Sequence, residues 1–186
     1  MDDHDCISLN TACALTGISK RTLWRRIADG SLPACKSCTS DKTLVSLAVV
    51  RQWAQLPLAD EDLALVLAAD HGEAEAQCDL GLLFLAAERP AEAVDWLERA
   101  ARHYYPEAMY WLGRCLVAGL GVAPDEAAGL AWLRKAADHG HTLARHALAF
   151  LHDPAARLAL GAHSPAALDA ALDAVERRAV AAMLAG

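Results

Sequence analysis

The sequence predicts a mainly α-helical protein, in which a short helix-turn-helix module precedes repeated helix–loop–helix units. The repeat is visible by eye, since residues 68–72 (Ala-Ala-Asp-His-Gly) return letter for letter at 136–140. A repeated segment indicates a repeated structural unit. Hydrophobic residues make up 55% of the chain and aromatic residues 5%, and this alanine-rich composition suits closely packed helices.

The N-terminal module is expected to begin with two helices joined by a tight turn. Asn10 is a suitable N-cap for a first helix over residues 11–15, because an Asn side chain can accept a hydrogen bond from a free N–H group of the first helical turn. Gly17 supplies the turn, since glycine tolerates positive φ. Ser19 is then expected to cap a second helix over residues 20–28.

Helix-breaking residues follow the second helix and separate it from a β-like segment. Gly30 and Pro33 end the helix, as glycine and proline commonly do at and just beyond a helix C-terminus. Residues 35–45 are polar with a β-like end, Thr-Leu-Val at 43–45, and this pattern is consistent with a two-stranded wing. Residues 47–56 then predict a third helix.

Positive charge is concentrated in this module. Residues 1–57 carry seven Lys and Arg against five Asp, a net charge of +2, whereas residues 58–186 carry ten Lys and Arg against nineteen Asp and Glu, a net charge of −9. Residues 19–42 hold six basic residues against two Asp, a local charge of +4. Phosphate contact requires such a local excess of positive charge. The asymmetry favours two modules with different partners.

The N-terminal module resembles the winged helix-turn-helix of excisionases and MerR-like regulators. The residues that carry the resemblance are Leu9, Ala12, Leu15, Thr16, Gly17, Ile18, Ser19, Thr22, Leu23, Ile27, Gly30, Leu32, Pro33 and Trp53. The resemblance implies that residues 20–26 form a recognition helix that enters the major groove of DNA. It also implies that Lys36 and Lys42 sit on a wing over the DNA backbone, while Ser19 and Thr22 approach phosphates or base edges.

Double-stranded DNA is therefore the expected partner of this module. The candidate contact residues are Ser19, Lys20, Arg21, Thr22, Trp24, Arg25, Arg26, Lys36 and Lys42. The alternative interpretation is a module that no longer binds DNA and uses its basic face to dock against protein. One module makes few phosphate contacts, so useful affinity would require a homodimer or adjacent copies on DNA.

The repeated units differ in length by four residues. Leu80-Gly81 recurs as Leu112-Gly113, an offset of 32, whereas Trp96-Leu97 recurs as Trp132-Leu133, an offset of 36. The extra residues fall in the glycine- and proline-containing stretch 118–125, which predicts a loop between two helices. Glycine inside a helix costs about 1 kcal/mol relative to alanine. The two helical glycines therefore predict close approach of a neighbouring helix.

Three motifs in this region resemble the Sel-like repeat, a relative of the tetratricopeptide repeat. They are Ala-Glu-Ala-Gln-x-x-Leu-Gly at 74–81, Gly-x-Gly-Val at 119–122 and Trp-Leu-x-Lys-Ala-Ala-Asp-x-Gly at 132–140. The resemblance implies an α-solenoid that binds protein partners and has no chemistry of its own. The expected domains are a winged helix-turn-helix at 1–57, the solenoid at 58–163 and a final amphipathic helix at 164–186, which serves either as a cap or for dimerisation.

Aromatic residues are concentrated in the middle of the repeat region, at Tyr104, Tyr105, Tyr110 and Trp111. They are the candidate partner-binding residues, because aromatic side chains are enriched among the strongest contacts of protein interfaces. The alternative, packing between helices, is also open for each of them. Trp96 and Trp132 match in register and are interpreted as packing residues.

Catalytic or metal-binding chemistry is not expected. Cys35 and Cys38 form a C-x-x-C motif without a second such pair, so zinc binding, a redox role and two ordinary thiols all stay open, the last being favoured. His71, His103 and His139 occupy one repeat position, which favours a structural role. No phosphate-binding glycine loop or nucleophile motif is found, so neither enzymatic activity nor a cofactor is predicted.

The remaining features indicate a cytoplasmic protein. No apolar run reaches the roughly 18 residues that span a membrane, and the acidic residues 1–5 lack the pattern of a signal peptide. The six cysteines are then expected to be reduced. The sequence thus predicts a bacterial-type DNA-binding transcription regulator whose acidic repeats bind a protein partner. The alternative is a non-enzymatic adaptor whose helix-turn-helix docks protein.

Overall fold

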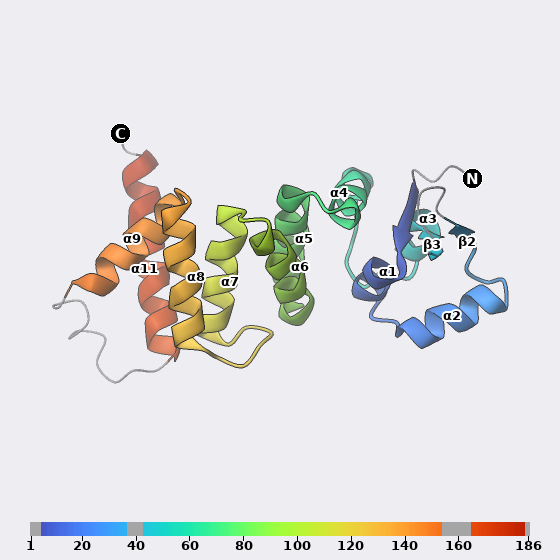
Figure 1. Ribbon diagram of the computed structural model, residues 1–186, viewed down its shortest axis with the longest axis horizontal. Helices are drawn as coiled ribbons and strands as arrows, with labels where there is room; N and C mark the ends of the chain where they lie inside the picture. Colours follow the sequence, from blue (N-terminus) through green and yellow to red (C-terminus); the bar gives the residue numbers. More distant parts are fainter. Residues whose placement is uncertain (1–4, 37–42, 154–164, 185–186) are drawn as a thin grey trace. The chain divides into compact units, whose positions relative to one another are not determined.

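The computed structural model describes residues 5–36, 43–153 and 165–184 and is mainly helical (Figure 1). The chain forms two compact units, Met1–Leu80 and Gly81–Gly186. The first unit contains β1 (Cys6–Ser8), α1 (Leu9–Thr16), α2 (Lys20–Ala28), β2 (Ala34–Lys36), β3 (Thr43–Ser46), α3 (Leu47–Arg51) and α4 (Asp60–His71). The unit boundary falls within α5 (Ala74–Ala86), and the second unit continues with α6 (Pro90–Arg102), α7 (Pro106–Ala118), α8 (Glu126–Asp138), α9 (Thr142–His152) and α11 (Pro165–Leu184).

A three-stranded antiparallel sheet organises the first unit. Its strand order is β1-β3-β2, with Ile7 opposite Val45 and Cys35 opposite Leu44. The β2–β3 pair matches the predicted wing, but β1 was not predicted because a three-residue strand is too short to show an alternating pattern. The sheet and helices enclose a core of fully buried side chains, which includes Ile7, Leu15, Leu23, Val45 and Val50.

The caps of the first two helices differ in one respect from the prediction. Ser8, not Asn10, caps α1, and its hydroxyl oxygen accepts a hydrogen bond from the backbone N–H of Thr11. The helix therefore begins two residues earlier than predicted, and the Asn10 side chain instead accepts a hydrogen bond from Nζ of Lys20 (2.9 Å). Gly17 ends α1 with a φ of +67° and Ser19 caps α2, so both of these predictions are confirmed.

The third helix is shorter than the predicted 47–56, because α3 ends at Arg51. Beyond it, the chain turns through bonds to carbonyls three residues back, and then the N–H of Gln55 donates to the carbonyl of Leu15 (2.9 Å). This bond draws the segment onto α1 and away from a helical path. The Arg51 side chain donates to the carbonyl of Leu58 and pairs with Asp60, which fixes the connection to α4.

Helix α4 is attached to α1 through one carboxylate. Asp70 accepts hydrogen bonds from the backbone N–H of Ser8 (2.8 Å), from the hydroxyl of Ser8 (2.6 Å) and from the hydroxyl of Thr11. Asp70 is the aspartate of the first Ala-Ala-Asp-His-Gly copy, whereas its counterpart Asp138 is exposed. The two copies of the motif therefore have different surroundings, and α4 packs as part of the first unit.

The helix pairs of the second unit meet at glycine, as predicted. A Cβ atom at Gly81 would lie 3.0 Å from Cγ of Leu97, and one at Gly113 would lie 3.0 Å from Cγ of Leu133. The same leucine position thus packs on the same glycine position in successive helix pairs. At the second crossing, a Cβ atom on Gly113 would also lie 2.9 Å from the carbonyl oxygen of Gly129.

Alanine at Gly113 is expected to lower the free energy of unfolding by about 1 kcal/mol. The added methyl group overpacks the α7–α8 crossing at a cost of about 1–3 kcal/mol, and the gain of about 1 kcal/mol in helix propensity offsets part of that cost. Gly81→Ala is the matched control, since its closest neighbours are side-chain atoms of Leu97, which can move. Urea denaturation should show a larger loss for Gly113→Ala; equal losses would contradict the role of the Gly129 carbonyl.

The tryptophans also repeat in register. The guanidinium carbon of Arg99 lies 4.3 Å from the ring centre of Trp96, and Nζ of Lys135 lies 4.1 Å from the ring centre of Trp132. Trp96 is buried at 1% exposure, while Trp132 is half-buried. A cation over the ring face favours this arrangement, and the burial of Trp96 agrees with the packing role expected for it.

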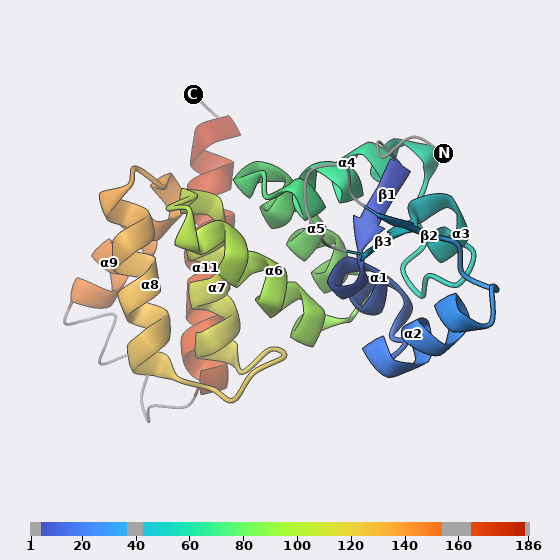
Figure 2. The ribbon, with the colours of Figure 1, turned by 45° about the vertical axis from the view of Figure 1, so that its right-hand side comes forward.

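The last helix packs its apolar stripe on the repeat helices. Figure 2 shows α11 alongside α7 and α9, and α11 packs against both of these helices. Leu168, Leu172, Val175 and Ala179 are buried along this face. Residue 164, where this helix was expected to begin, lies outside the described residues. Within the described part of the chain, no helix is both long enough and apolar enough to cross a membrane.

Candidate functional site

The outward face of α2 carries most of the predicted DNA-contacting residues. Lys20, Arg21, Trp24 and Arg25 are exposed, and Trp24 keeps 46% of its surface exposed. Leu23 on the opposite side is fully buried, so packing of this residue fixes which face of the helix reaches the surface. The Ser19 hydroxyl accepts a hydrogen bond from the backbone N–H of Thr22, which places both residues at the start of this face.

Two of the basic side chains on α2 already have contacts within the unit. The guanidinium carbon of Arg26 lies 4.3 Å from the ring centre of Trp53, and Nζ of Lys20 donates to Asn10. Among the residues that the structure describes, the side chains of Arg21 and Arg25 form no hydrogen bond or ion pair, although the charge of Arg25 contributes to lowering the pKa of Asp29. Arg21 and Arg25 are therefore the cations most available to an external anion.

The predicted wing residues fall largely outside the described part of the chain. Lys36 ends β2, but its side chain is outside the described residues, and Lys42 lies outside them entirely. The same holds for the side chain of Cys35 and for Cys38. The part of the chain that is described holds no group of three or more His, Cys, Asp or Glu suited to a metal ion.

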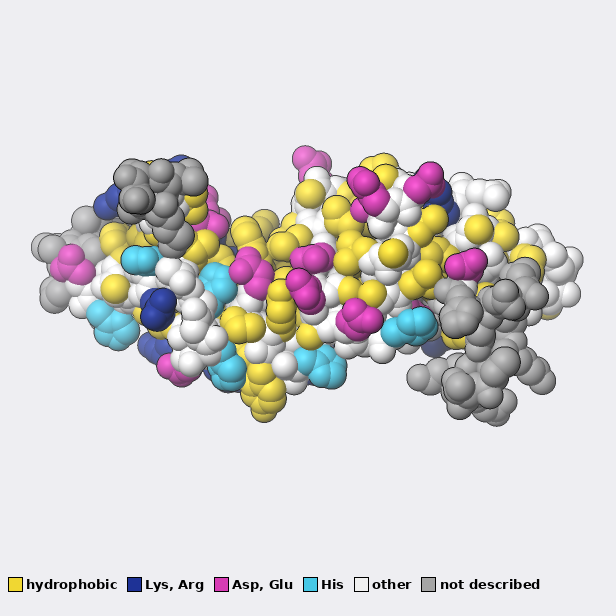
Figure 3. All heavy atoms as spheres, turned by 90° about the horizontal axis from the view of Figure 1, so that it is seen from above, with side chains coloured by type: hydrophobic (Ala, Val, Ile, Leu, Met, Phe, Trp, Pro, Cys, Tyr) yellow, Lys and Arg dark blue, Asp and Glu magenta, His cyan; other side chains and the backbone are white. Residues whose placement is uncertain are grey.

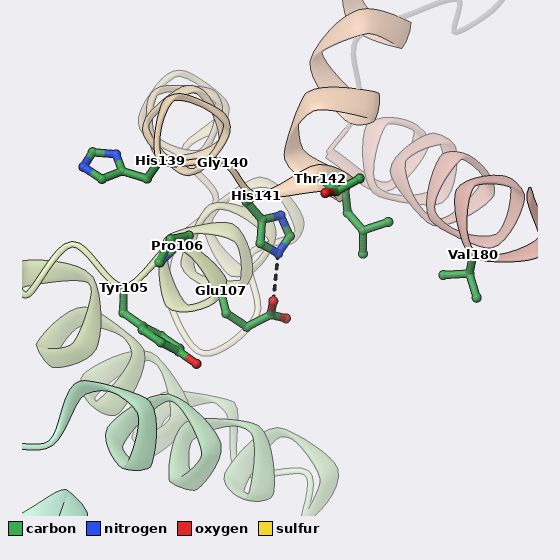
Figure 4. Close-up of a pocket in the computed structure, with 9 residues that line it drawn as sticks. Tyr105, Pro106, Glu107, His139, Gly140, His141, Thr142 and Val180 are labelled. Carbon is green, nitrogen blue, oxygen red and sulfur yellow. Dashed lines mark hydrogen bonds and ion pairs between the residues drawn. The ribbon is translucent and has the colours of Figure 1, made fainter. Parts of the chain in front are cut away.

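The second unit contains a groove formed by two neighbouring pockets. The first, of about 450 Å³, lies between the start of α7, the loop before α9 and α11. The second, of about 570 Å³, runs along α11. Val180 lines both pockets and is 43% exposed. We call this surface the α7–α9–α11 groove; Figure 4 shows the first pocket, with His141 directed toward Glu107 and Val180 on the α11 side.

The four aromatic residues predicted to bind a partner occupy different environments. Tyr105 lines the groove, and Tyr104 is 67% exposed and stacks on the ring of His139 (5.6 Å between ring centres). Tyr110 is buried at 1% exposure, because its ring packs under the groove against His141 (4.5 Å). Trp111 is half-buried and donates its indole N–H to Glu107 (2.7 Å). Tyr104 is therefore the exposed member of the four, Tyr105 and Trp111 are half-buried, and Tyr110 packs in the interior.

His141 supports the groove wall with both ring nitrogens. Its Nδ1 accepts a hydrogen bond from the backbone N–H of Ala144 and caps α9. The proton therefore resides on Nε2, which lies 2.8 Å from Oε2 of Glu107 and donates to it. This hydrogen bond, together with the one from Trp111, lowers the pKa of Glu107 despite partial burial. His141 directly precedes α9, a capping position that the sequence analysis did not single out.

Arg114 lies buried behind the α11 side of the groove. Its side chain is 8% exposed, and its guanidinium binds Asp169 (2.8 Å), Glu176 (2.9 Å) and Asp173. It also donates to the hydroxyl of Tyr110 (3.4 Å), and burial raises the pKa of Tyr110 to about 12. The sequence carried a signal for this cluster, since the three carboxylates recur at one-turn spacing on one face of a helix, but it gave no indication of their partner.

The family whose model matches this region is the Sel1 repeat, over residues 74–105 and 106–141. Residues 74–141 are two Sel1 repeats. Each repeat begins at the first helix of a pair, α5 at Ala74 and α7 at Pro106. Sel1 repeats imply a protein–protein interaction domain and are typically modules without enzymatic activity.

A solved structure of a Sel1 repeat protein from Oxalobacter formigenes is also similar to this chain. Its sequence is 26% identical, the match covers 74% of this chain and 86% of that chain, and the TM-score is 0.43. Among curated proteins, no match is found. The repeats are therefore identified by the family model and by the glycine–leucine contacts that recur between the helix pairs.

Proposed function

We propose that this protein is a DNA-binding transcription regulator whose Sel1 repeats bind a protein partner. The observation that carries the DNA-binding part is the exposed face of α2, where Arg21 and Arg25, one turn apart, are exposed together with Trp24. Helix α2 is the second helix of a helix-turn-helix, the element that enters the major groove in such modules. Guanidinium groups one turn apart on this face can reach phosphates or guanine edges.

The protein-binding part rests on the repeats. The α7–α9–α11 groove combines an exposed aliphatic side chain with polar walls held in place by hydrogen bonds. Preformed concave surfaces with a few convergent polar groups are the usual form of a binding site. Tyr105 at the rim adds an aromatic side chain of the kind that interfaces favour.

A second candidate function is a pure adaptor whose first unit docks against protein. It is favoured by one observation, the 46% exposure of Trp24, because a large exposed aromatic residue contributes well to a protein interface. The two functions predict different salt dependence. Contact with DNA phosphates releases counterions and weakens steeply with salt, whereas docking around a tryptophan does not.

Gel-shift titrations of duplex DNA at about 50 mM and about 200 mM salt test the regulator function. We expect binding that weakens with salt, and the variant Arg21→Ala/Arg25→Ala should lower both the affinity and, by about two, the slope of log affinity against log salt. The control variant Arg134→Ala/Arg145→Ala removes the same charge from exposed positions on α8 and α9. Absence of duplex binding at micromolar protein and low salt would reject the regulator function and leave the adaptor.

A further inference from the structure

The walls of the α7–α9–α11 groove carry an excess of negative charge. Glu107 lines the first pocket, and Asp173 and Glu176 line the second. The cation among the lining residues of the second pocket is Arg177. Figure 3 shows carboxylates (magenta) and histidines (cyan) among hydrophobic side chains (yellow) on the face of the second unit that it views.

Neither Arg114 nor His141 neutralises this excess of negative charge. Arg114 is buried behind the second pocket and is shared among Asp169, Asp173 and Glu176, so one guanidinium faces three carboxylates. His141 adds no positive charge, because its Nδ1 accepts the hydrogen bond from Ala144 and only Nε2 carries a proton. The Asp, Glu, Lys and Arg residues that line the two pockets are Glu107, Asp173, Glu176 and Arg177, which give three negative charges against one positive charge, a net charge of −2.

The carboxylate nearest to solvent is Asp173, whose side chain is 44% exposed. Glu107 is also 42% exposed at its side chain, and its lowered pKa keeps it ionised at neutral pH. The hydrogen bonds and ion pairs within the protein therefore leave part of each side chain exposed to solvent. Both carboxylates keep surface through which an external cation can approach.

One exposed apolar side chain is shared by the two pockets. Val180 is exposed and belongs to both pockets, and it follows Asp173 by seven residues, about 10 Å along a helix. An extended peptide rises about 3.3 Å per residue. A ligand that covers Val180 with an apolar side chain therefore reaches Asp173 with a residue about three positions away.

We propose that the α7–α9–α11 groove binds a basic segment of a partner protein, in which Lys or Arg residues flank an aliphatic or aromatic side chain about three positions away. The apolar side chain covers Val180, one cation faces Asp173, and a cation on the other side faces Glu107. This inference rests on the partner-binding part of the proposed function and specifies the chemistry of the partner. Charge complementarity selects this occupant over an acidic or an uncharged segment.

Fluorescence anisotropy with the full-length protein tests this inference with three labelled peptides. The first, Lys-Lys-Gly-Gly-Leu-Gly-Gly-Lys-Lys, has the proposed pattern; the second replaces every Lys by Glu, and the third replaces Leu by Gly. We expect the first peptide to bind most tightly, the third more weakly, and the second not measurably. Equal binding of the Lys and Glu peptides, or no binding of the first, would overturn the inference.

Three variants locate the binding. Asp173→Asn is expected to weaken the first peptide about two- to fivefold, in line with an exposed ion pair, and Val180→Ser should remove the advantage of Leu over Gly. Glu126→Gln is the control, because it removes one negative charge from an exposed position at the start of α8, away from the groove. Circular dichroism melting of each variant distinguishes lost binding from lost folding. Equal weakening by Glu126→Gln and Asp173→Asn would overturn the assignment to the groove.

Further outcomes distinguish a failure of this inference from a failure of the proposed partner binding on which it rests. Crosslinking of a partner to the Sel1 repeats at positions outside the groove, with no effect of Asp173→Asn or Val180→Ser, would overturn the groove as the site and leave partner binding intact. Gel-shift activity is independent of both, since it depends on α2. A loss of peptide binding in these two variants, with gel shifts unchanged, would support the inference.

Discussion

Replacing Arg114 by methionine is expected to lower the free energy of unfolding by about 3 kcal/mol. Removing one partner of a buried ion pair typically costs 3–5 kcal/mol, because the remaining charges lose their compensation. Here three carboxylates on α11 would face one another across the vacated position. The lower end of the range is appropriate because the Asp173 side chain is 44% exposed and can regain water.

Urea denaturation followed by circular dichroism measures this loss. The control is Asp173→Asn, which leaves Arg114 paired with Asp169 and Glu176. It should lower the free energy of unfolding by less than about 1 kcal/mol, the usual contribution of an exposed ion pair. Adding Asp169→Asn, Asp173→Asn and Glu176→Gln to Arg114→Met should recover part of the loss, since the repulsion is then removed. An Arg114→Met protein as stable as the parent would show that α11 does not depend on this cluster.

Alanine at Gly121 is expected to be about as damaging, with a loss of about 2–4 kcal/mol. Gly121 has a φ of +72°, a conformation that costs an L-residue about 1–2 kcal/mol. In addition, a Cβ atom there would lie 2.3 Å from the carbonyl carbon of Pro90, at the start of α6. Backbone atoms cannot rotate away as a side chain can, so the whole 119–125 loop would have to move off α6.

Gly140→Ala separates the two contributions at Gly121. Gly140 has a φ of +91° and no atom within 4 Å of an added Cβ, so this control bears only the conformational cost. The difference between the two variants in thermal or urea denaturation then measures the contact with Pro90. If both variants lose the same stability, the close approach of the loop to α6 has no energetic consequence.

The register of the repeats could be predicted from the sequence because the same residue types recur at regular offsets along the chain. Gly81 and Gly113 recur with the leucines that cover them, and loop lengths are visible as a difference in offset. The caps at Gly17 and Ser19 were predictable for the same reason, since a cap acts within one helical turn.

Features that depend on distant partners were not predictable from the sequence. Ser8 caps α1 while bound to Asp70, 62 residues away in the chain, and the short strand β1 exists only because β3 pairs with it. Arg114 gives no local sign that it will be buried, since its partners lie 55 to 62 residues further on. Likewise, the burial of Tyr110 follows from its stacking on His141 across the next helix pair.

The hydrogen bonds of Asp70 have a practical consequence for dividing the chain into fragments. A cut after residue 57, where the charge of the sequence changes sign, would leave Ser8 and Thr11 on one piece and their shared carboxylate on the other. Each fragment would then expose polar groups that are satisfied only when both are present. Dissection of this protein therefore requires α4 to stay with the N-terminal helices.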